Sequence, residues 1–562
     1  MRADGGQGGP APSAQAPHPR DIYGKTTARR RFGRSWKGAL PVEDFNAGAV
    51  EAVLDSLPKT VQGPGGVAGV VKDGRIVAAR AWGYADLTAA RPMTAATRMP
   101  ICSISKQFTC GTLLATAGGP ELFDDRLAGY LPRFEGALPT VRQLCDNQSG
   151  LRDYWALTVL HGARAEQEFR REDALPLIAR MRTGHFAPGT QYSYCNCNFR
   201  ILGEMIMAHT GRGLEDLYRE HIWGLAGMET AVLTADTRVP ADGVVGYEGS
   251  ADHGYLPADN GIYWIGDAGI SASLNDMLAY EAWIDATRDD PQSIYRRLSV
   301  TPHFVDGTRA WYGYGLAHER IGDVDFTGHG GALRGFRAHR MNARSARLSV
   351  VVMLNHEADA HACAARIAGA ALGLPDPAEP PMPEGWDGLW LDRDRGMIAR
   401  IVTDRTSARL FYATGPVRLL AAEGGALAAP NLRVERDGAG LRLAIAGENT
   451  LRHLEPLEEI DAADGATIAG EYETDELEAR LRIEARDGGV FARFEGMLGQ
   501  GRMEQMIPVA RDIWAVVTRR SMDAPAPGIW TFVVARDAAG KVTGGTLGCW
   551  LARGIGYRRI GG

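Results

Sequence analysis

Residues 103–110 read Ser-Ile-Ser-Lys-Gln-Phe-Thr-Cys, a run compatible with a helix. In a helix, residues three apart share a face, so Ser103 and Lys106 are expected to lie side by side. A serine hydroxyl is a poor nucleophile and needs a base within hydrogen-bond reach. A partly buried lysine can be that base, because desolvation disfavours its charged form. Ser-x-x-Lys alone occurs by chance in most long proteins. Its interpretation as a catalytic pair therefore depends on the other motifs in the chain.

A second candidate element lies in residues 186–196, Phe-Ala-Pro-Gly-Thr-Gln-Tyr-Ser-Tyr-Cys-Asn. Pro-Gly predicts a turn, and Tyr194-x-Asn196 predicts a phenol and an amide on one side of an extended segment. A phenol against a lysine ammonium loses its proton more easily and can then act as general base and later as general acid. Asn196 can donate to a substrate carbonyl and accept from the lysine. The simpler alternative is a buried tyrosine with an asparagine in a turn.

The third element is Thr327-Gly328-His329-Gly330-Gly331, with Gly335-Phe336 entering a strand. Glycines beside a catalytic site let backbone approach a ligand, and a strand edge there can supply an oxyanion-hole amide. His329 is expected to face the serine, and Gly331 to approach the substrate. The alternative is a histidine in an ordinary turn.

Strand patterns bracket a largely helical middle. Residues 66–81 predict a hairpin around Asp73-Gly74, and strands are again predicted near 335–342 and over 348–354. Helical patterns dominate from about residue 103 to residue 300. This order predicts an α+β fold whose sheet pairs its two terminal portions around a helical insertion.

Beyond this region the composition changes. Residues 1–41 are basic and rich in Gly, Pro and Ala, which predicts a disordered tail, and residues 373–385 predict a Pro-rich linker. Short alternating strands then predict two small antiparallel β-barrel domains, 386–459 and 460–562. Gly388 and Gly470 lie 82 residues apart, as do Ile401 and Ile483, which indicates an internal duplication.

Charge, apolar runs and cysteine content exclude several classes of partner and binding site. The net charge is −6 although residues 1–40 carry +6, and an acidic body argues against nucleic acid as a partner. The sequence contains no apolar run of about 18 residues, so no membrane span is predicted. Seven scattered cysteines fit a reducing cytoplasm. Neither Cys195-x-Cys197 nor the His356/His361 pair has a zinc-site spacing, so no metal and no cofactor are predicted.

Ser103-x-x-Lys106, Tyr194-x-Asn196 and His329-x-Gly331, in this order, resemble the three motifs of the penicillin-recognising serine hydrolases. The resemblance covers about residues 42–372 and implies a catalytic domain like those of β-lactamases and penicillin-binding proteins. Many relatives have Lys-Thr-Gly at the third motif, where the lysine grips a substrate carboxylate. Here His329 stands in that place and is mostly neutral near pH 7, which weakens the case for a carboxypeptidase or a β-lactamase.

The rest of the chain is similar to the three-domain D-stereospecific aminopeptidases, including the runs 267–270 and 549–554. In that family a loop of the last domain enters the catalytic cleft and binds the substrate amine. The resemblance places this loop at about 519–529 and the amine-binding carboxylate at Asp523. It implies hydrolysis of N-terminal D-amino acids from peptides, amides and esters through a serine acyl-enzyme. It also implies β-lactams as inhibitors and a homodimer.

Two alternatives remain. An esterase or β-lactamase on the same scaffold would differ in whether the 519–529 loop reaches the cleft. A non-enzymatic sensor of β-lactams or peptidoglycan fragments would differ in its deacylation rate. Such a receptor usually adjoins a membrane span or signalling domain, and the sequence shows neither.

Overall fold

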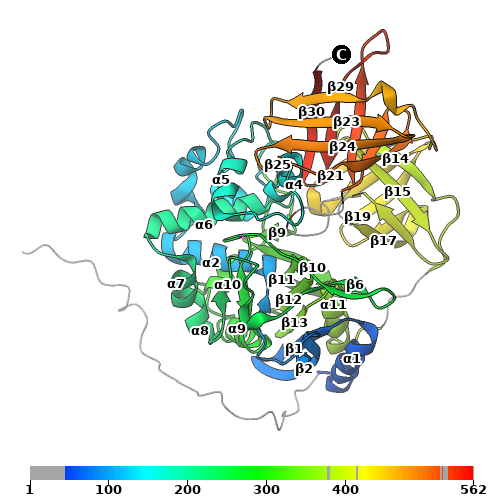
Figure 1. Ribbon diagram of the computed structural model, residues 1–562. Coiled ribbons are helices and arrows are strands. Elements are labelled where there is room, and N and C mark those ends of the chain that lie inside the picture. Colours follow the sequence, from blue (N-terminus) through cyan, green and yellow to red (C-terminus); the bar gives the residue numbers. More distant parts are fainter. Residues whose placement is uncertain (1–44, 376–379, 413–414, 519–521, 523–528, 561–562) are drawn as a thin grey trace, which may run out of the picture. The chain divides into compact units, whose positions relative to one another are not determined.

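The computed structural model describes residues 45–375, 380–412, 415–518, 522 and 529–560 (Figure 1). The expected tail at 1–41, part of the expected linker and nearly all of the expected 519–529 loop, Asp523 included, lie outside these residues. No helix within the described ranges is both long and apolar enough to cross a membrane.

An eight-stranded antiparallel sheet forms the centre of residues 45–375, with the order β3-β2-β1-β13-β12-β11-β10-β9. Its strands are β1 (Gly65–Lys72), β2 (Arg75–Asp86), β3 (Arg91–Pro92), β9 (Tyr312–Gly313), β10 (Leu316–Ile321), β11 (Val324–Leu333), β12 (Phe336–Ala343) and β13 (Leu348–Leu354). Asp73 and Gly74 both have positive φ, as the tight turn between β1 and β2 requires. β1 pairs with β13 from Gly66↔Leu354 to Lys72↔Leu348. The predicted hairpin and the pairing of the two terminal portions are therefore confirmed.

Helices cover both faces of this sheet (Figure 1). On one face α1 (Ala47–Thr60) and α11 (Ala360–Ala371) pack together, and α11 lies on β12 and β13. Ala360, Ala364 and Ala368 are buried one turn apart, and their small side chains let α11 approach β13 closely. Every residue of β13 is buried, and its five consecutive apolar residues from Val350 to Leu354 are typical of a strand covered on both sides.

The other face carries the helical insertion. Its main helices are α2 (Ser105–Ala117), α6 (Asn196–Thr210) and α9 (Leu274–Ala286). The shorter helices are α3 (Val141–Cys145), α4 (Tyr154–Leu160), α5 (Arg171–Ile178), α7 (Leu214–Tyr218), α8 (Gly224–Ala226) and α10 (Ile294–Leu298). Three short strands, β4 (Met99–Pro100), β5 (Val232–Leu233) and β8 (Ile270–Ala272), form a small sheet, and β6 (Tyr247–Ser250) pairs with β7 (Gly254–Pro257).

Two antiparallel barrels follow. The first closes through β14 (Gly388–Asp392), β15 (Met397–Thr403), β16 (Ala408–Phe411), β17 (Pro416–Ala421), β18 (Leu427–Ala429), β19 (Leu432–Asp437), β20 (Gly440–Ile445) and β21 (Thr450–Pro456). The second contains β22 (Gly470–Thr474), β23 (Ala479–Arg486), β24 (Gly489–Gly496), β25 (Gly499–Gln500), β26 (Glu504–Ala510), β27 (Ile513–Val516), β28 (Trp530–Arg536), β29 (Val542–Cys549) and β30 (Ala552–Ile560), and the β23–β24 pairing closes it. The predicted α+β domain followed by two barrels is confirmed.

The first hairpins of the two barrels have the same register. Gly388 pairs with Ile401 in the first barrel, and Gly470 pairs with Ile483 in the second. These four residues are the ones whose common spacing indicated a duplication. The repeat in the sequence therefore corresponds to an equivalent pair of strands at the start of each barrel.

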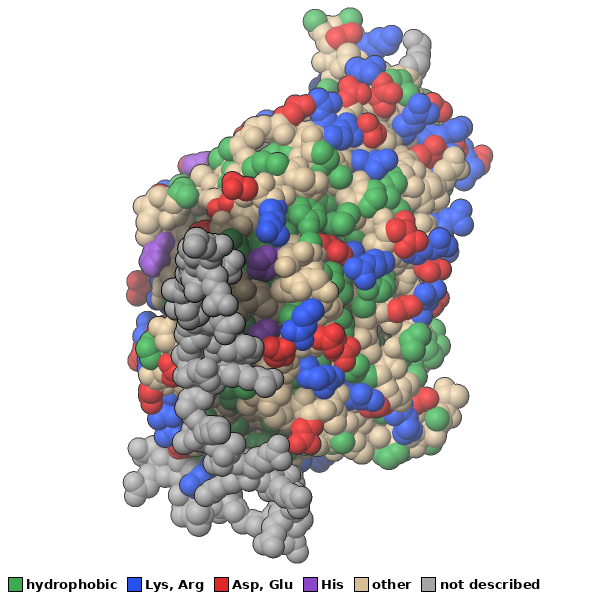
Figure 2. Space-filling model, turned by 90° about the vertical axis from the view of Figure 1, so that its left-hand side faces the viewer, with side chains coloured by type: hydrophobic (Ala, Val, Ile, Leu, Met, Phe, Trp, Pro, Cys, Tyr) green, Lys and Arg blue, Asp and Glu red, His purple; other side chains and the backbone are tan. Residues whose placement is uncertain are grey.

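The surface shown in Figure 2 mixes charges of both signs. Lys and Arg side chains lie among Asp and Glu side chains over the described part of this face. Elsewhere in the described chain, exposed charges form ion pairs such as Arg182 with Glu135 and Arg212 with Glu220. Exposed pairs of this kind contribute little to stability but keep opposite charges interspersed.

Candidate active site

Ser103 lies in the short 3-10 turn η2 (Cys102–Ile104), which leads directly into α2. The preceding residue, Cys102, has a φ of 52°, a left-handed conformation that is rare for a residue other than glycine. Strained backbone of this kind clusters at functional sites. A Cβ at Gly331 would lie 2.3 Å from the Ile101 carbonyl oxygen, so the lack of a side chain lets β11 pack against the turn. Gly331 thus makes a close approach to the serine-bearing turn, and its approach to the substrate stays a prediction.

Lys106 projects from the first turn of α2 and is fully buried. Its Nζ lies 3.0 Å from Ser103 Oγ, 2.8 Å from Asn196 Oδ1 and 2.8 Å from the main-chain oxygen of Asp267. The structure therefore brings the two ends of the first motif and the asparagine of the second into direct contact. The Asp267 carbonyl is a partner that no spacing in the sequence indicates.

Tyr194 lies beside the same lysine, with Lys106 Nζ 5.0 Å from the centre of its ring. Burial raises the pKa of Tyr194 well above its usual value, and a hydrogen bond with Ser103 opposes this shift. The sequence predicted that the lysine would ease loss of the phenol proton. That direction is wrong, because burial outweighs the favourable contacts. Tyr194 therefore keeps its proton at neutral pH.

Asn196 is the first residue of α6, so it does not continue the extended segment that contains Tyr194. Its main-chain N–H donates to the carboxylate of Asp153, and its side-chain oxygen accepts from Lys106. The sequence predicted the contact with lysine correctly but not its geometry. The helix start, rather than the alternation of a strand, aims the amide at Lys106.

His329 lies inside β11 rather than in a turn and is buried. Its Nδ1 donates to the Gly330 carbonyl, so its Nε2 accepts from the Tyr312 hydroxyl at 2.8 Å. Its ring centre is 6.2 Å from that of Tyr194. Burial, with the nearby positive charge of Lys106, lowers the pKa of His329 to about 3. The histidine is therefore neutral at neutral pH, as the sequence predicted.

A turn of the second barrel reaches this cluster. Trp550, between β29 and β30, stacks on Tyr194 with ring centres 6.5 Å apart and planes 13° apart. Its Nε1 donates to Glu448 Oε1 at 3.0 Å, and the Leu551 carbonyl accepts from the Asp153 amide at 2.9 Å. The sequence marked residues 549–554 only as a point of resemblance. The long chain separation between Trp550 and Tyr194 leaves no local pattern that could reveal their contact.

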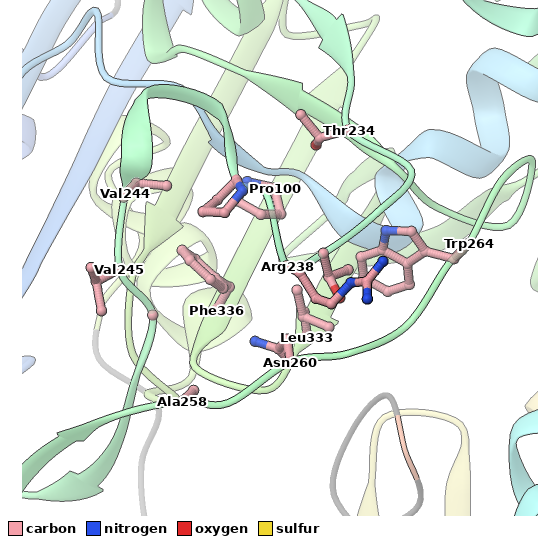
Figure 3. Close-up of a pocket in the computed structure, with 13 residues that line it drawn as sticks. Pro100, Thr234, Arg238, Val244, Val245, Ala258, Asn260, Trp264, Leu333 and Phe336 are labelled. Carbon is pink, nitrogen blue, oxygen red and sulfur yellow. The ribbon is translucent and has the colours of Figure 1, made fainter. Parts of the chain in front are cut away.

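A cavity of about 170 Å³ lies beside the end of β11 (Figure 3). Its mostly apolar wall includes Pro100, Trp264, Leu333 and Phe336. Arg238 also lines the cavity, but its charge is engaged by Asp236 at 2.7 Å. Pro100 precedes the serine-bearing turn and Leu333 follows the third motif. The cavity thus adjoins both candidate segments without being lined by Ser103.

Comparisons with known proteins agree with this architecture. Residues 50–373 match the family model described as beta-lactamase, and residues 380–558 match the model of D-aminopeptidase domain B. A D-aminopeptidase of Cereibacter sphaeroides is 62% identical over 91% of this chain and 99% of its own length. A D-aminopeptidase of Brucella melitensis is 47% identical over 91% of this chain and 98% of its own length.

Among solved structures, an octameric penicillin-binding protein homologue from Pyrococcus abyssi shares the fold. It superposes with a TM-score of 0.52 at 18% identity, covering 73% of this chain and 99% of its own. Both family models and the curated relatives span the catalytic part and the barrels together. The chain therefore belongs to the D-aminopeptidase family.

Proposed function

We propose that this protein is a D-aminopeptidase that releases small N-terminal D-amino acids, such as D-Ala, from peptides, amides and esters through an acyl-enzyme on Ser103. The observation that carries the mechanism is the contact between Ser103 Oγ and Lys106 Nζ at 3.0 Å, in a buried cluster that also holds Tyr194 and Asn196. A nucleophile within hydrogen-bond reach of a base is the arrangement that covalent catalysis needs.

Lys106 is placed to remove the serine proton. A neutral lysine amine has two hydrogens and one lone pair. Asn196 Oδ1 and the Asp267 carbonyl accept those two hydrogens, which leaves the lone pair directed at the Ser103 hydroxyl. In this protonation state Ser103 Oγ becomes nucleophilic as it attacks the substrate carbonyl carbon, and its proton moves to Lys106.

Tyr194 is placed to protonate the leaving amine. Burial raises its pKa, so the phenol carries a proton when the tetrahedral intermediate forms. Collapse of that intermediate breaks the amide bond, and the departing nitrogen takes the Tyr194 proton. The proton that Lys106 took from Ser103 then passes to the Tyr194 phenolate, so both groups regain their starting protonation states. Water attacks the acyl carbon and gives one proton to Lys106, and Ser103 Oγ takes that proton back as it leaves the released D-amino acid.

The developing oxyanion requires main-chain donors. β10 pairs with β11 only as far as Gly328, so among the described strands the outer edge of β11 from His329 to Leu333 has no partner. Amides on this edge and the amide of Ser103 are the proposed oxyanion hole. The close packing of Gly331 against Ile101 holds the edge beside the serine.

The charges of the side chains at the proposed site favour one charged end of the substrate over the other. His329 is neutral, so it does not offer a cation to a substrate carboxylate. An N-terminal ammonium instead needs an anion, and Asp523 is the proposed partner on the family resemblance. β-Lactams present a strained amide to the same serine, and we expect them to inhibit weakly.

Two further expectations concern the oligomeric state of the protein and its cellular compartment. The family resemblance leads us to expect a homodimer, which size-exclusion chromatography with light scattering would test.

All seven cysteines lie in the described part of the chain, and they are buried and free of disulfides. This supports a reducing cytoplasm as the working compartment.

The decisive experiment is hydrolysis of D-alanine p-nitroanilide and its L-isomer by the wild type and by Ser103→Ala. We expect turnover of the D-isomer alone, and its loss in the variant. Turnover of short-chain esters but of neither anilide would retain the serine hydrolase and reject the D-aminopeptidase. Equal turnover by Ser103→Ala would reject the nucleophile.

A further inference from the structure

Three metal-ligating side chains meet on the face of the sheet opposite His329. Glu319 comes from β10, His339 from β12 and His361 from α11, and their ligand atoms all lie within 4.8 Å of one another. His339 pairs with Gly330, the neighbour of His329 in β11. Because successive residues of a strand point to opposite faces, this cluster lies behind the catalytic strand.

The distances within the cluster suit a bridging cation better than a direct hydrogen bond. His339 Nε2 and Glu319 Oε1 are 3.6 Å apart, and both atoms are buried without a hydrogen-bond partner among the described residues. A separation of 3.6 Å is too long for a hydrogen bond. Two ligands of one tetrahedral zinc ion, each about 2.1 Å from it, lie about 3.4 Å apart. An ion between these atoms would satisfy both.

The glycines of β11 make room for this arrangement. Glu319 pairs with Phe326 and His339 pairs with Gly330, so Gly328 lies between them on the same face. At Gly330 a Cβ would already lie 3.4 Å from His339 Nδ1. A larger side chain at Gly330 would occupy the space in which the ligands meet, and a Cβ at Gly328 would lie 2.3 Å from the Arg340 carbonyl oxygen. The third motif therefore presents His329 to the catalytic cluster and two glycines to this one.

We propose that Glu319, His339 and His361 bind one Zn²⁺ ion, with water as the fourth ligand. Two imidazole nitrogens and a carboxylate oxygen are a common zinc ligand set. The ligands come from two strands and a helix, which is why no spacing in the sequence predicted the site. His361 Nε2 lies 2.7 Å from Glu319 Oε2, so the imidazole already lies beside the carboxylate with which it would share the ion.

The burial and the exposure of the three residues favour this ligand set. The Glu319 side chain is 20% exposed, and its Oε1 is buried beside the two histidines. The His361 side chain is 52% exposed, which gives the ion and its water access from solvent. His339 is nearly fully buried and fixes the inner side of the site.

Bound zinc would connect α11 to β10 and β12, the strands on both sides of β11. Its effect is expected on the stability of this part of the fold, because the ion lies behind β11 and the proposed chemistry uses the other face. The proposal is thus independent of the aminopeptidase reaction. Loss of zinc need not abolish turnover, and loss of turnover would not remove zinc.

The test uses the full-length protein, stripped with EDTA, exchanged into chelator-free buffer and loaded with ZnCl2. After gel filtration, elemental analysis is expected to find one zinc per chain. Loading with Co²⁺ instead is expected to give the visible bands of a four-coordinate site. Zinc should raise the Tm of the wild type by several degrees, since a ligand that binds only the folded state stabilises it.

Two variants and a matched control separate this site from adventitious binding. His361→Ala changes the exposed ligand and His339→Gln the buried one, and both should lose the bound zinc and the zinc-dependent rise in Tm. His253→Ala removes an exposed histidine in the turn before β7 and should retain both. No zinc in the wild type after gel filtration, or equal zinc in His361→Ala, would overturn the proposal.

Discussion

The indole of Trp550 lies nearly parallel to the phenol of Tyr194, with ring centres 6.5 Å apart and planes 13° apart. One residue belongs to the last barrel and the other to the catalytic cluster. Two hydrogen bonds fix the position of Trp550. Its Nε1 donates to Glu448, and the carbonyl of the adjoining Leu551 accepts from the main-chain amide of Asp153. The second barrel thus contributes an aromatic side chain to the candidate active site.

Replacing Trp550 by alanine should impair catalysis more than folding. The change removes the ring that stacks on Tyr194, and displacement of this proposed proton donor would slow turnover. We expect kcat/KM for D-alanine p-nitroanilide to fall about tenfold, which corresponds to about 1.4 kcal/mol. Trp550→Phe keeps an aromatic face and should retain most of the activity. Equal activity of the alanine and phenylalanine variants would show that the stacking does not position Tyr194.

Tyr194→Phe should distinguish substrates by their leaving groups. An amine must be protonated to depart, whereas p-nitrophenolate leaves as an anion. We expect hydrolysis of D-alanine p-nitroanilide to fall by about 10²–10⁴-fold, and hydrolysis of D-alanine p-nitrophenyl ester to fall much less. Parallel losses for both substrates would mean that Tyr194 acts on the serine proton rather than on the leaving group.

The sequence predicted the sheet and the motifs because both rest on local patterns. The apolar run 350–354 is typical of a strand covered on both faces, and Asp73-Gly74 favours the tight turn that the structure has. The protonation of Tyr194 could not be predicted in the same way. Its pKa depends on burial, which packing from several elements creates, and the sequence showed only the lysine that acts in the opposite direction.

Contacts between distant segments also escaped prediction. The Asp267 carbonyl reaches Lys106 through main chain, so its side-chain type carries no information about the contact. Glu319, His339 and His361 meet only because β10 and β12 flank β11 and α11 lies over them. Such sites become visible only when the register of the sheet is known.

Gly331→Ala should damage both stability and activity. The new Cβ would lie 2.3 Å from the Ile101 carbonyl oxygen, so β11 or the turn that bears Ser103 must move. Overpacking of this kind costs about 1–3 kcal/mol, and a displacement of about 1 Å at the nucleophile can cost about 100-fold in rate. Thermal unfolding and kcat for D-alanine p-nitroanilide measure the two effects.

The adjacent Gly330→Ala is the matched control for this change. Its Cβ would come no closer than 3.4 Å to any neighbouring atom, the Nδ1 of His339, so the strand can stay in place. We expect near-normal kcat in Gly330→Ala. A loss equal to that of Gly331→Ala would mean that the strand tolerates no side chain on either face, and the close approach to Ile101 would not be the cause.

His161 should make the stability of the protein depend on pH. It caps the end of α4, and its Nδ1 accepts the amide of Met497 at 3.4 Å in the second barrel. Burial, with the positive charge of Arg180, lowers its pKa from 6.5 to about 4. Between these values the unfolded chain binds the proton and the folded protein does not. The contribution of neutral His161 is therefore complete above pH 6.5 and is lost as the pH falls toward 4.

His161→Gln should reduce this acid sensitivity, because the glutamine oxygen can accept the same amide and does not titrate. A pKa difference of this size corresponds to an upper limit of about 3 kcal/mol. We expect the fall in unfolding free energy between pH 7.5 and pH 4.5 to be smaller in the variant by up to about that amount. Urea denaturation at both pH values measures it, and His253→Gln, at an exposed position, should behave like the wild type. If His161→Gln and the wild type lose stability equally, protonation of His161 does not limit the stability of the protein in acid. The half-buried His318, whose pKa burial also lowers to about 4, then becomes the group to replace.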